Sequence, residues 1–486
     1  MKLMPFCLCA ALMAFGCSSD DTSSTDDVGS TDGTTATDGT TATDGTTATD
    51  GTDATDSTDA TEPTIDYPLE VTAPDSWVAD MARIPRAVRM TWQQDPSSTI
   101  TFQWATTDRD TDAYAPVVWI TPVTDLGANE SLKYDPAWVT TGEGFVYQNT
   151  FNDIPVDDAE FVVWTVEVTG LDPSTEYAYR VGAWEDFDAD SKAFVNASLS
   201  PKEQFKTGPV VGSRDPFSFV MAGDSRGGTD EIRKNIERLA GYDANMWFFA
   251  GDMTNGGTPG EWDDWYDSMR PVLSSKVLMP IQGNHEIFAD LYYNQVALPV
   301  GGDMLDDDLK EHAWSIDYGN IHFVGLDSNT QERVIDQLPW LDADLAEARQ
   351  NADIDWIIIL FHHAAYSASK HGSTKWVQEN FVPLFEKHDV DLVFNGHDHN
   401  YERSVPIRGD AESADDGVTY VVAGGFFSPG YGNGNEWWTV VSHHGDVGNW
   451  VHMSVDGPKL KLTAWSGTEG PDVDGAAPLD EHTLNK

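Results

Sequence analysis

Basic residues are scarce in this 486-residue sequence: 28 Lys and Arg stand against 81 Asp and Glu, a formal net charge of −53 at pH 7. Nucleic acids and anionic membrane surfaces are bound through basic patches, so the composition argues against both as partners. The same repulsion opposes an anionic substrate unless that substrate meets a locally positive site. Bound cations would supply such a site.

Cysteine is confined to the first 17 residues, as Cys7, Cys9 and Cys17, which leaves no disulfide option for the rest of the chain. Lys2, an apolar run and Gly16 before Cys17 are typical of a secretory signal peptide over residues 1–17. The ending AFGC resembles a bacterial lipobox, in which Cys17 is lipidated; a signal peptide cut elsewhere is the alternative. We therefore expect an exported protein, either an outer-membrane or cell-surface lipoprotein or a periplasmic or secreted one. It would touch the membrane through its lipid anchor only.

Three composition zones follow the predicted signal peptide. Residues 18–66 contain no Lys or Arg and repeat TDGTTA, which predicts a disordered tether. Residues 67–208 hold β-rich runs such as STITFQWAT and EFVVWTVEVTG and no histidine, which predicts an all-β sandwich without histidine chemistry. Residues 209–486 alternate strand and helix patterns, including a helix capped by Thr229 and a helical segment KWVQENFVPLFEKHD. This pattern predicts an α/β domain.

Five of the predicted strands in the α/β domain end in polar clusters, namely GDSRGG, GDMTN, GNHE, FHH and GHDH. Ligands of open α/β sheets bind beyond the carboxyl ends of the strands, and glycine allows the tight turns that aim side chains into one space. Histidine nitrogens with carboxylate and amide oxygens suit Zn, Fe or Mn. Five such clusters in order are hard to attribute to turn chemistry alone. The candidate metal ligands are Asp224, Asp252, Asn255, Asn284, His362, His397 and His399.

Two metal ions would also overcome the repulsion between this acidic protein and an anionic substrate. Ions about 3.5–4 Å apart, joined by one carboxylate, clamp a phosphoryl group and lower the pKa of a bound water towards 7. The site would then be cationic inside an acidic protein.

The order of motifs resembles that of the calcineurin-like metallophosphoesterase superfamily: GD, GD, GNHE, a histidine and GHDHNYER. GHDHNYER and the β-sandwich ahead of it resemble purple acid phosphatases more narrowly. The resemblance covers roughly residues 80–486, including the closing LDEHTLNK. It implies a four-layer α/β/β/α sandwich behind a fibronectin-III-like domain. It also implies a centre of two divalent or mixed-valence ions, Fe, Mn or Zn.

The resemblance assigns roles residue by residue. Asp252 would bridge both ions, Asp224 and His399 would hold the first, and Asn284, His362 and His397 the second. Asp398 would point away from the centre. His285 would contact the substrate phosphate and assist the leaving group, and His371, nine residues after His362, would contact phosphate too. His363 is a further candidate for substrate contact, with packing beneath the strand as the alternative.

Two positions depart from the family pattern. The tyrosine that gives purple acid phosphatases their colour stands three residues after the bridging aspartate, and here that residue is Asn255. We therefore predict a colourless protein and favour Mn, Zn or ferrous iron. Arg226 stands where other superfamily members place a metal-binding histidine. Its guanidinium group could contact phosphate as a catalytic residue or pair with a neighbouring carboxylate.

The sequence thus predicts an exported, lipid-anchored, dinuclear phosphoesterase. It would hydrolyse phosphomonoesters by attack of a metal-bound hydroxide, with His285 or His371 protonating the leaving oxygen. A phosphodiesterase or nucleotidase on the same site is one alternative. A non-catalytic surface binding protein on a retired phosphatase scaffold is another.

Overall fold

The computed structural model describes residues 65–72, 77–108, 110–111, 115–151, 154–286, 291–302, 304–305 and 310–486. The predicted signal peptide, Cys17 and all but the last two residues of the predicted tether lie outside these ranges. Among the residues described, no helix combines the length and the apolar character that crossing a membrane requires.

The front part of the chain is an antiparallel β-sandwich, as predicted. One sheet has the order β2-β3-β8-β7, with bounds Arg86–Thr91, Thr99–Thr106, Ile154–Thr169 and Glu143–Phe151. The other has the order β12-β9-β4-β6, with bounds Ser198–Leu199, Glu176–Ala183, Val117–Pro122 and Val139–Thr141, and β13 (Glu203–Lys206) also pairs with β9. Phe102 of β3 packs on Tyr179 of β9 with ring centroids 4.7 Å apart, which closes the core between the sheets.

Short strand pairs and 3-10 turns also occur in this sandwich and in the α/β part that follows it. Two-stranded pairs are β1 (Leu69–Glu70) with β5 (Lys133–Tyr134), β10 (Asp186–Asp188) with β11 (Ala193–Val195), and β22 (Ile407–Arg408) with β23 (Ala411–Glu412). Single 3-10 turns are η1 (Met81–Arg83), η2 (Val123–Asp125), η3 (Ala128–Glu130) and η4 (Pro136–Trp138).

Two larger sheets form the α/β part. The first has the order β16-β15-β14-β26-β27-β28, with bounds Val277–Pro280, Met246–Phe249, Phe217–Ala222, Asn449–Asp456, Lys459–Ser466 and Asp480–Asn485. The second has the order β17-β18-β19-β20-β24-β21-β25, with bounds Trp314–Tyr318, Ile321–Gly325, Trp356–Leu360, Leu392–Asn395, Thr419–Ala423, Tyr401–Ser404 and Thr439–His443. Strands β14, β15 and β16 run parallel, as do β18, β19, β20 and β24.

The helices α1 to α6 are Asp230–Ala240, Pro259–Leu273, Leu291–Gln295, Gln331–Gln350, Lys375–Asn380 and Val382–Lys387. Thr229 caps α1 as predicted, because its side-chain oxygen accepts the Ile232 N–H at 3.1 Å. The segment KWVQENFVPLFEKHD is helical as predicted, and it forms two helices, α5 and α6, separated at Phe381. Pro383 has no N–H to donate to residue 379, so the helical ladder is interrupted there.

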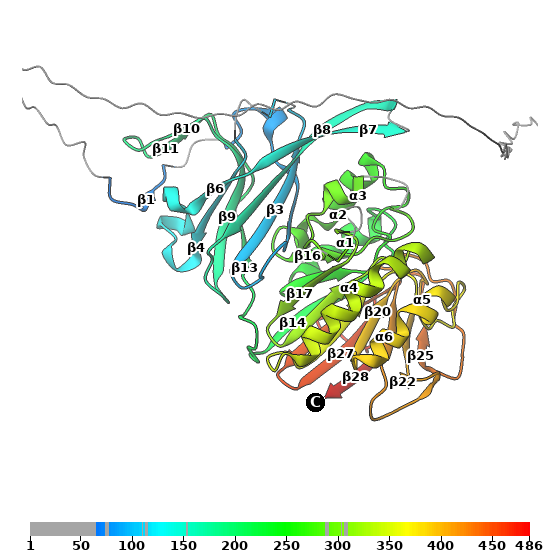
Figure 1. Cartoon of the computed structure of the whole chain (residues 1–486). Coiled ribbons are helices and arrows are strands. Elements are labelled where there is room, and N and C mark those ends of the chain that lie inside the picture. Colours follow the sequence, from blue (N-terminus) through cyan, green and yellow to red (C-terminus); the bar gives the residue numbers. More distant parts are fainter. Residues whose placement is uncertain are drawn as a thin grey trace, which may run out of the picture. The chain divides into compact units, whose positions relative to one another are not determined.

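The order of the layers is visible in the side chains of β15, which point alternately to its two sides. Phe248 of β15 faces the second sheet, where its ring lies 4.5 Å from Phe323 of β18. The next residue, Phe249, faces the opposite way and packs on Trp265 of α2 at 5.5 Å. Helices α4, α5 and α6 lie side by side against the second sheet (Figure 1). The helix, sheet, sheet, helix order is the four-layer sandwich that was predicted.

Candidate metal centre

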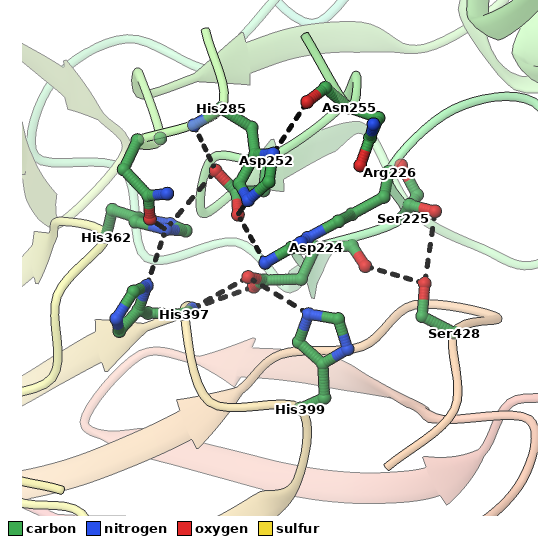
Figure 2. Close-up of polar contacts among 12 residues, drawn as sticks. Asp224, Ser225, Arg226, Asp252, Asn255, His285, His362, His397, His399 and Ser428 are labelled. Atoms are coloured by element: carbon green, nitrogen blue, oxygen red, sulfur yellow. Dashed lines mark hydrogen bonds and ion pairs between the residues drawn. The ribbon is translucent and has the colours of Figure 1, made fainter. Parts of the chain in front are cut away.

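The candidate ligands follow the ends of parallel strands. Asp224 follows β14, Asp252 follows β15, Asn284 follows β16, and His362 follows β19. His397 and His399 follow β20. Because these strands run parallel within each sheet, their carboxyl ends deliver the side chains to one small region (Figure 2).

Glycine is required where backbones approach the carboxylates closely. A Cβ on Gly396 would lie 2.4 Å from Asp224 Oδ2, and one on Gly283 would lie 2.2 Å from Asp252 Oδ1. Both distances are shorter than any real contact of a Cβ atom, so only glycine fits. The backbone is also unusual at Asp224 and Asp252, whose φ angles are 59° and 54°. Such strain is kept where the surrounding structure imposes it, most often at functional sites.

The centre of the cluster is buried. Asp224, Asp252 and His362 each offer one ligand atom, and these atoms lie within 4.8 Å of one another. His362 Nε2 is 3.4 Å from Asp252 Oδ1 and 3.0 Å from Asn284 Oδ1. His397 Nδ1 lies 3.3 Å from the same His362 nitrogen. The structure therefore brings together the ligands predicted for the second ion.

The tautomer of His362 tests whether these residues fit a cation. His362 Nδ1 is 2.7 Å from the Ala250 carbonyl oxygen, so Nδ1 donates its proton there. In the neutral ring, Nε2 then points a lone pair at oxygens that are themselves acceptors. Burial opposes a charge on His362, but Asp252 and Asp224 raise its pKa to about 10. The surroundings favour positive charge at Nε2, which a metal ion would supply.

The ligands predicted for the first ion also fit. His399 Nδ1 lies 3.2 Å from the Pro429 carbonyl oxygen, which leaves Nε2 to face Asp224 Oδ1 at 3.7 Å. His399 Nε2 and Asp252 Oδ2 are buried without a hydrogen-bond partner. Burial raises the pKa of Asp224 well above its usual value. Arg226 Nη2 is 3.4 Å from Asp252 Oδ2, and a coordinated ion would satisfy both of these buried acceptors.

His285 and His371 flank the cluster. The His285 backbone N–H donates to Asp252 Oδ1 at 3.0 Å, and its ring Nδ1 lies 2.6 Å from the Asn255 carbonyl oxygen. His285 Nε2 is left facing Asp252 Oδ2, 3.9 Å away. His371 is exposed, and its ring lies 4.3 Å from the ring of His397. Both are placed where a substrate on the cluster would meet them, and their roles stay predictions.

His363 lies behind the ligands. It is buried, its Nδ1 is 3.2 Å from Ser328 Oγ, and its ring lies 4.4 Å from the ring of His397. Burial and the neighbouring His362 lower the pKa of His363 to about 3, which keeps it neutral. These contacts favour the packing interpretation over the predicted substrate contact, which stays a prediction.

The two departures from the family pattern have different surroundings. Arg226 Nη2 lies 3.4 Å from Asp252 Oδ2, which is the carboxylate pairing given as one alternative for Arg226. Asn255 is exposed, and it is the backbone carbonyl of Asn255 that receives the His285 Nδ1 proton. Metal binding by the Asn255 side chain stays a prediction.

Glu286, the last residue of GNHE, has a positioning role that the sequence analysis missed. This buried carboxylate accepts the backbone N–H groups of Asp252, Gly283 and Thr254 at 2.9, 3.0 and 2.8 Å. It thereby ties the loop after β15 to the loop after β16. A charged residue directly beside a ligand motif was the only signal in the sequence.

Asp398 and Tyr431 also act on site residues. Asp398 points away from the cluster and accepts the N–H of His371 at 2.9 Å, so it positions the loop that carries His371. Tyr431, from a glycine-rich loop, stacks on His399 with ring centroids 3.9 Å apart and an angle of 11°. No sequence pattern connected Tyr431 to this histidine.

Comparisons with known proteins agree with this architecture. The family model described as calcineurin-like phosphoesterase matches residues 217–401. The model described as purple acid phosphatase, N-terminal domain, matches residues 85–207. The matched ranges lie inside the two predicted domains, whose bounds at 67–208 and 209–486 stay predictions.

Two relatives match parts of the chain. Purple acid phosphatase 21 of Arabidopsis thaliana is 28% identical over 255 residues, which are 50% of this chain and 53% of that protein. An uncharacterized protein of Mycobacterium tuberculosis is 32% identical over 169 residues, which are 30% of this chain and 32% of that protein. The chain thus spans between about a third and a half of the length of these relatives.

A solved structure shares the fold. The purple acid phosphatase PPD1 from yellow lupin (Lupinus luteus) seeds superposes with a TM-score of 0.66 at 19% identity, covering 83% of this chain and 74% of that one.

Proposed function

Because this chain joins a purple acid phosphatase N-terminal domain to a calcineurin-like phosphoesterase domain, we propose that it is a metal-dependent hydrolase of phosphomonoesters. The observation that carries this proposal is the buried group of Asp224, Asp252 and His362, whose ligand atoms lie within 4.8 Å of one another. Retired sites are free to lose such groups, whereas here the donors and the loops that hold them are all in place.

Two ions would be held by this chain's own donors. Asp252 would serve both, with Asp224 and His399 on one side and Asn284, His362 and His397 on the other. Bound there, the ions would supply positive charge for the phosphoryl oxygens and lower the pKa of a water ligand. Because Asn255 supplies no phenolate, we propose that the loaded protein is colourless, and a visible absorption band would contradict this.

His285 is proposed as the general acid. Its Nδ1 proton is engaged by the Asn255 carbonyl oxygen at 2.6 Å, so the nitrogen that faces the cluster is Nε2. Nε2 lies 3.9 Å from Asp252 Oδ2, so in the doubly protonated ring its proton would point to the cluster, where a leaving oxygen would lie. His285→Gln should therefore slow hydrolysis of an alkyl phosphate more than that of p-nitrophenyl phosphate, whose leaving group needs no proton. Equal losses on both substrates would contradict the role.

We further propose that the protein is exported and anchored through Cys17. The support is the apolar stretch before Gly16 and Cys17, and the threonine-rich, acidic stretch after it. Radiolabelled palmitate should enter the full-length protein in a bacterium with an outer membrane. Cys17→Ala should abolish labelling, and Cys9→Ala should not. Persistent labelling of Cys17→Ala would contradict the anchor.

The test of the activity compares p-nitrophenyl phosphate with bis-p-nitrophenyl phosphate, with Mn²⁺, Zn²⁺ or Fe²⁺ supplied. Monoester hydrolysis that disappears in Asp252→Asn and persists in Asp344→Asn would support the proposal. Asp344 is a matched control because its carboxylate pairs with His322, outside the cluster. Release mainly from the diester would move the function to a phosphodiesterase or nucleotidase. No release with any metal, and no metal bound, would favour a binding protein on a retired scaffold.

A further inference from the structure

Arg226 places a permanent positive charge inside the candidate metal centre. Its backbone is fixed by a hydrogen bond from its N–H to the Asp252 carbonyl oxygen at 2.9 Å, with a left-handed φ of 55°. This conformation turns the side chain inward, and Figure 2 shows it reaching toward the Asp252 carboxylate, with Asp224 on the other side of the guanidinium group. Such a backbone costs energy for a residue other than glycine, so the surrounding structure must impose it.

The shortest ion-pair distance from Arg226 to Asp252 is to Oδ2. Oδ2 lies 3.4 Å from Arg226 Nη2. Oδ1 instead accepts the His285 N–H at 3.0 Å and lies 3.4 Å from His362 Nε2. The two oxygens of the carboxylate proposed as a bridge therefore have different neighbours: Oδ1 has the His285 amide and His362, and Oδ2 has the guanidinium group of Arg226, with His285 Nε2 farther away at 3.9 Å.

The charge of Arg226 also reaches the remaining ligands of the first position. Figure 2 shows the guanidinium group between the carboxylates of Asp252 and Asp224, so the same charge faces both acidic ligands of that position. A guanidinium group stays protonated at any working pH, so its charge cannot be removed to admit a metal ion.

We propose that Arg226 makes the two metal positions unequal, so that the ion held by Asp224, Asp252 and His399 binds more weakly than the ion held by Asn284, His362 and His397. Arg226 would compete for Asp252 Oδ2 and repel an ion held with Asp224 and His399, whereas His362, the neighbour of Oδ1, would itself be a ligand of the second ion. This proposal rests on the proposed dinuclear function, because it concerns the same ligands. The first position would fill only when free metal is abundant, and activity would follow its filling.

The test is a metal titration of the full-length protein. After dialysis against a chelator, Mn²⁺ binding is followed by equilibrium dialysis, and electron paramagnetic resonance detects coupling between neighbouring ions. The wild type should bind one equivalent tightly and a second only at higher Mn²⁺. Arg226→Gln should tighten the weak step at least about tenfold, the lower end of the effect of outer-sphere groups on metal affinity. Arg226→Lys, which keeps the charge, should resemble the wild type.

His399→Gln assigns the steps, because it should remove the weak step and leave the tight one. Equal affinity for both equivalents in the wild type would overturn the proposal. An unchanged or weaker second step in folded Arg226→Gln, verified by its thermal unfolding, would also overturn it. These readouts require no hydrolysis. Two-step binding without phosphatase activity would therefore refute only the function, and activity with equal steps would refute only the role of Arg226.

Discussion

Two buried histidines of the α/β part, His322 and His362, both lie between carboxylates, yet their surroundings differ in kind. His322, on β18, pairs Nδ1 with Asp317 at 2.7 Å and Nε2 with Asp344 at 2.9 Å. Each nitrogen has one partner, and Ser315 Oγ donates to the second oxygen of Asp344 at 2.7 Å. His362 donates a hydrogen bond from Nδ1 to a backbone carbonyl oxygen, and its Nε2 lies near several acceptor atoms.

The difference separates a structural ion pair from a ligand site. A protonated His322 satisfies both of its carboxylates, so the cluster is complete without any further cation. At His362, one proton on Nε2 cannot satisfy Asp252 Oδ1, Asn284 Oδ1 and the nearby His397 together. A surplus of acceptors around a single nitrogen, with its other nitrogen held by a carbonyl group, is the pattern of a metal ligand.

The largest expected effect is on metal binding and catalysis. His362→Ala should lower phosphatase activity and the affinity for metal by at least about 100-fold, the upper end of what losing an outer-sphere partner costs. His322→Ala should leave both unchanged when assayed well below its unfolding temperature. The measurements are kcat/KM and metal analysis of the purified variants. Loss of metal in His322→Ala would show that the two histidines do not differ as inferred.

The second effect is on stability. His322→Ala leaves Asp317 and Asp344 without their common cation, and breaking a buried pair costs about 3–5 kcal/mol. Because Asp317 retains 32% side-chain exposure, we expect about 3 kcal/mol, near the lower end. Urea unfolding of the chelator-treated proteins measures this loss. The double variant Asp317→Asn with Asp344→Asn should make His322→Ala nearly neutral, and an additive loss would contradict the pairing.

The third effect is the dependence of stability on pH. Burial alone would lower the pKa of His322, but hydrogen bonds to Asp317 and Asp344 raise it from 6.5 to about 9. Because the pKa is raised in the folded state, the stabilisation is complete below pH 6.5 and is lost as pH rises through 9. At 1.36 kcal/mol per pKa unit, about 3 kcal/mol should disappear over this window. The difference between wild type and His322→Phe should shrink accordingly, and a constant difference would contradict the assignment.

The two histidines have the same side chain, but their positions relative to the predicted strands differ in the sequence. His322 lies inside a strand, Ile321–Gly325, whereas His362 stands two residues beyond the end of Trp356–Leu360. The cluster was predicted from the position of its residues after parallel strands, because the carboxyl ends of such strands lie together in the fold. The placement of Asp224, Asp252, Asn284, His397 and His399 followed from the same reasoning, whereas the four-layer fold followed from the family resemblance.

The remaining features depend on contacts distant in the chain. The tautomer of His362 is set by Ala250, 112 residues away, and His399 is covered by Tyr431 from a loop without a pattern. The pairing of Arg226 with Asp252 depends on a backbone angle that the sequence GDSRGG does not specify. The helical character of KWVQENFVPLFEKHD was predicted, whereas its division into α5 and α6 at Phe381 was not, although Pro383 lies beside the break.

The smallest expected effect is stabilisation by bound metal. Ions that bind only the folded protein stabilise it by about 2.7 kcal/mol when their free concentration is 100 times the dissociation constant. A chelator should therefore lower the unfolding midpoint of the wild type. His322→Ala should start from a lower midpoint and lose the same increment, because its defect lies elsewhere. His362→Ala should be nearly insensitive to the chelator, since it has lost the donor that the ion requires. If His322→Ala were insensitive and His362→Ala responded, the identities of the structural and the metal-binding histidine would have to be exchanged.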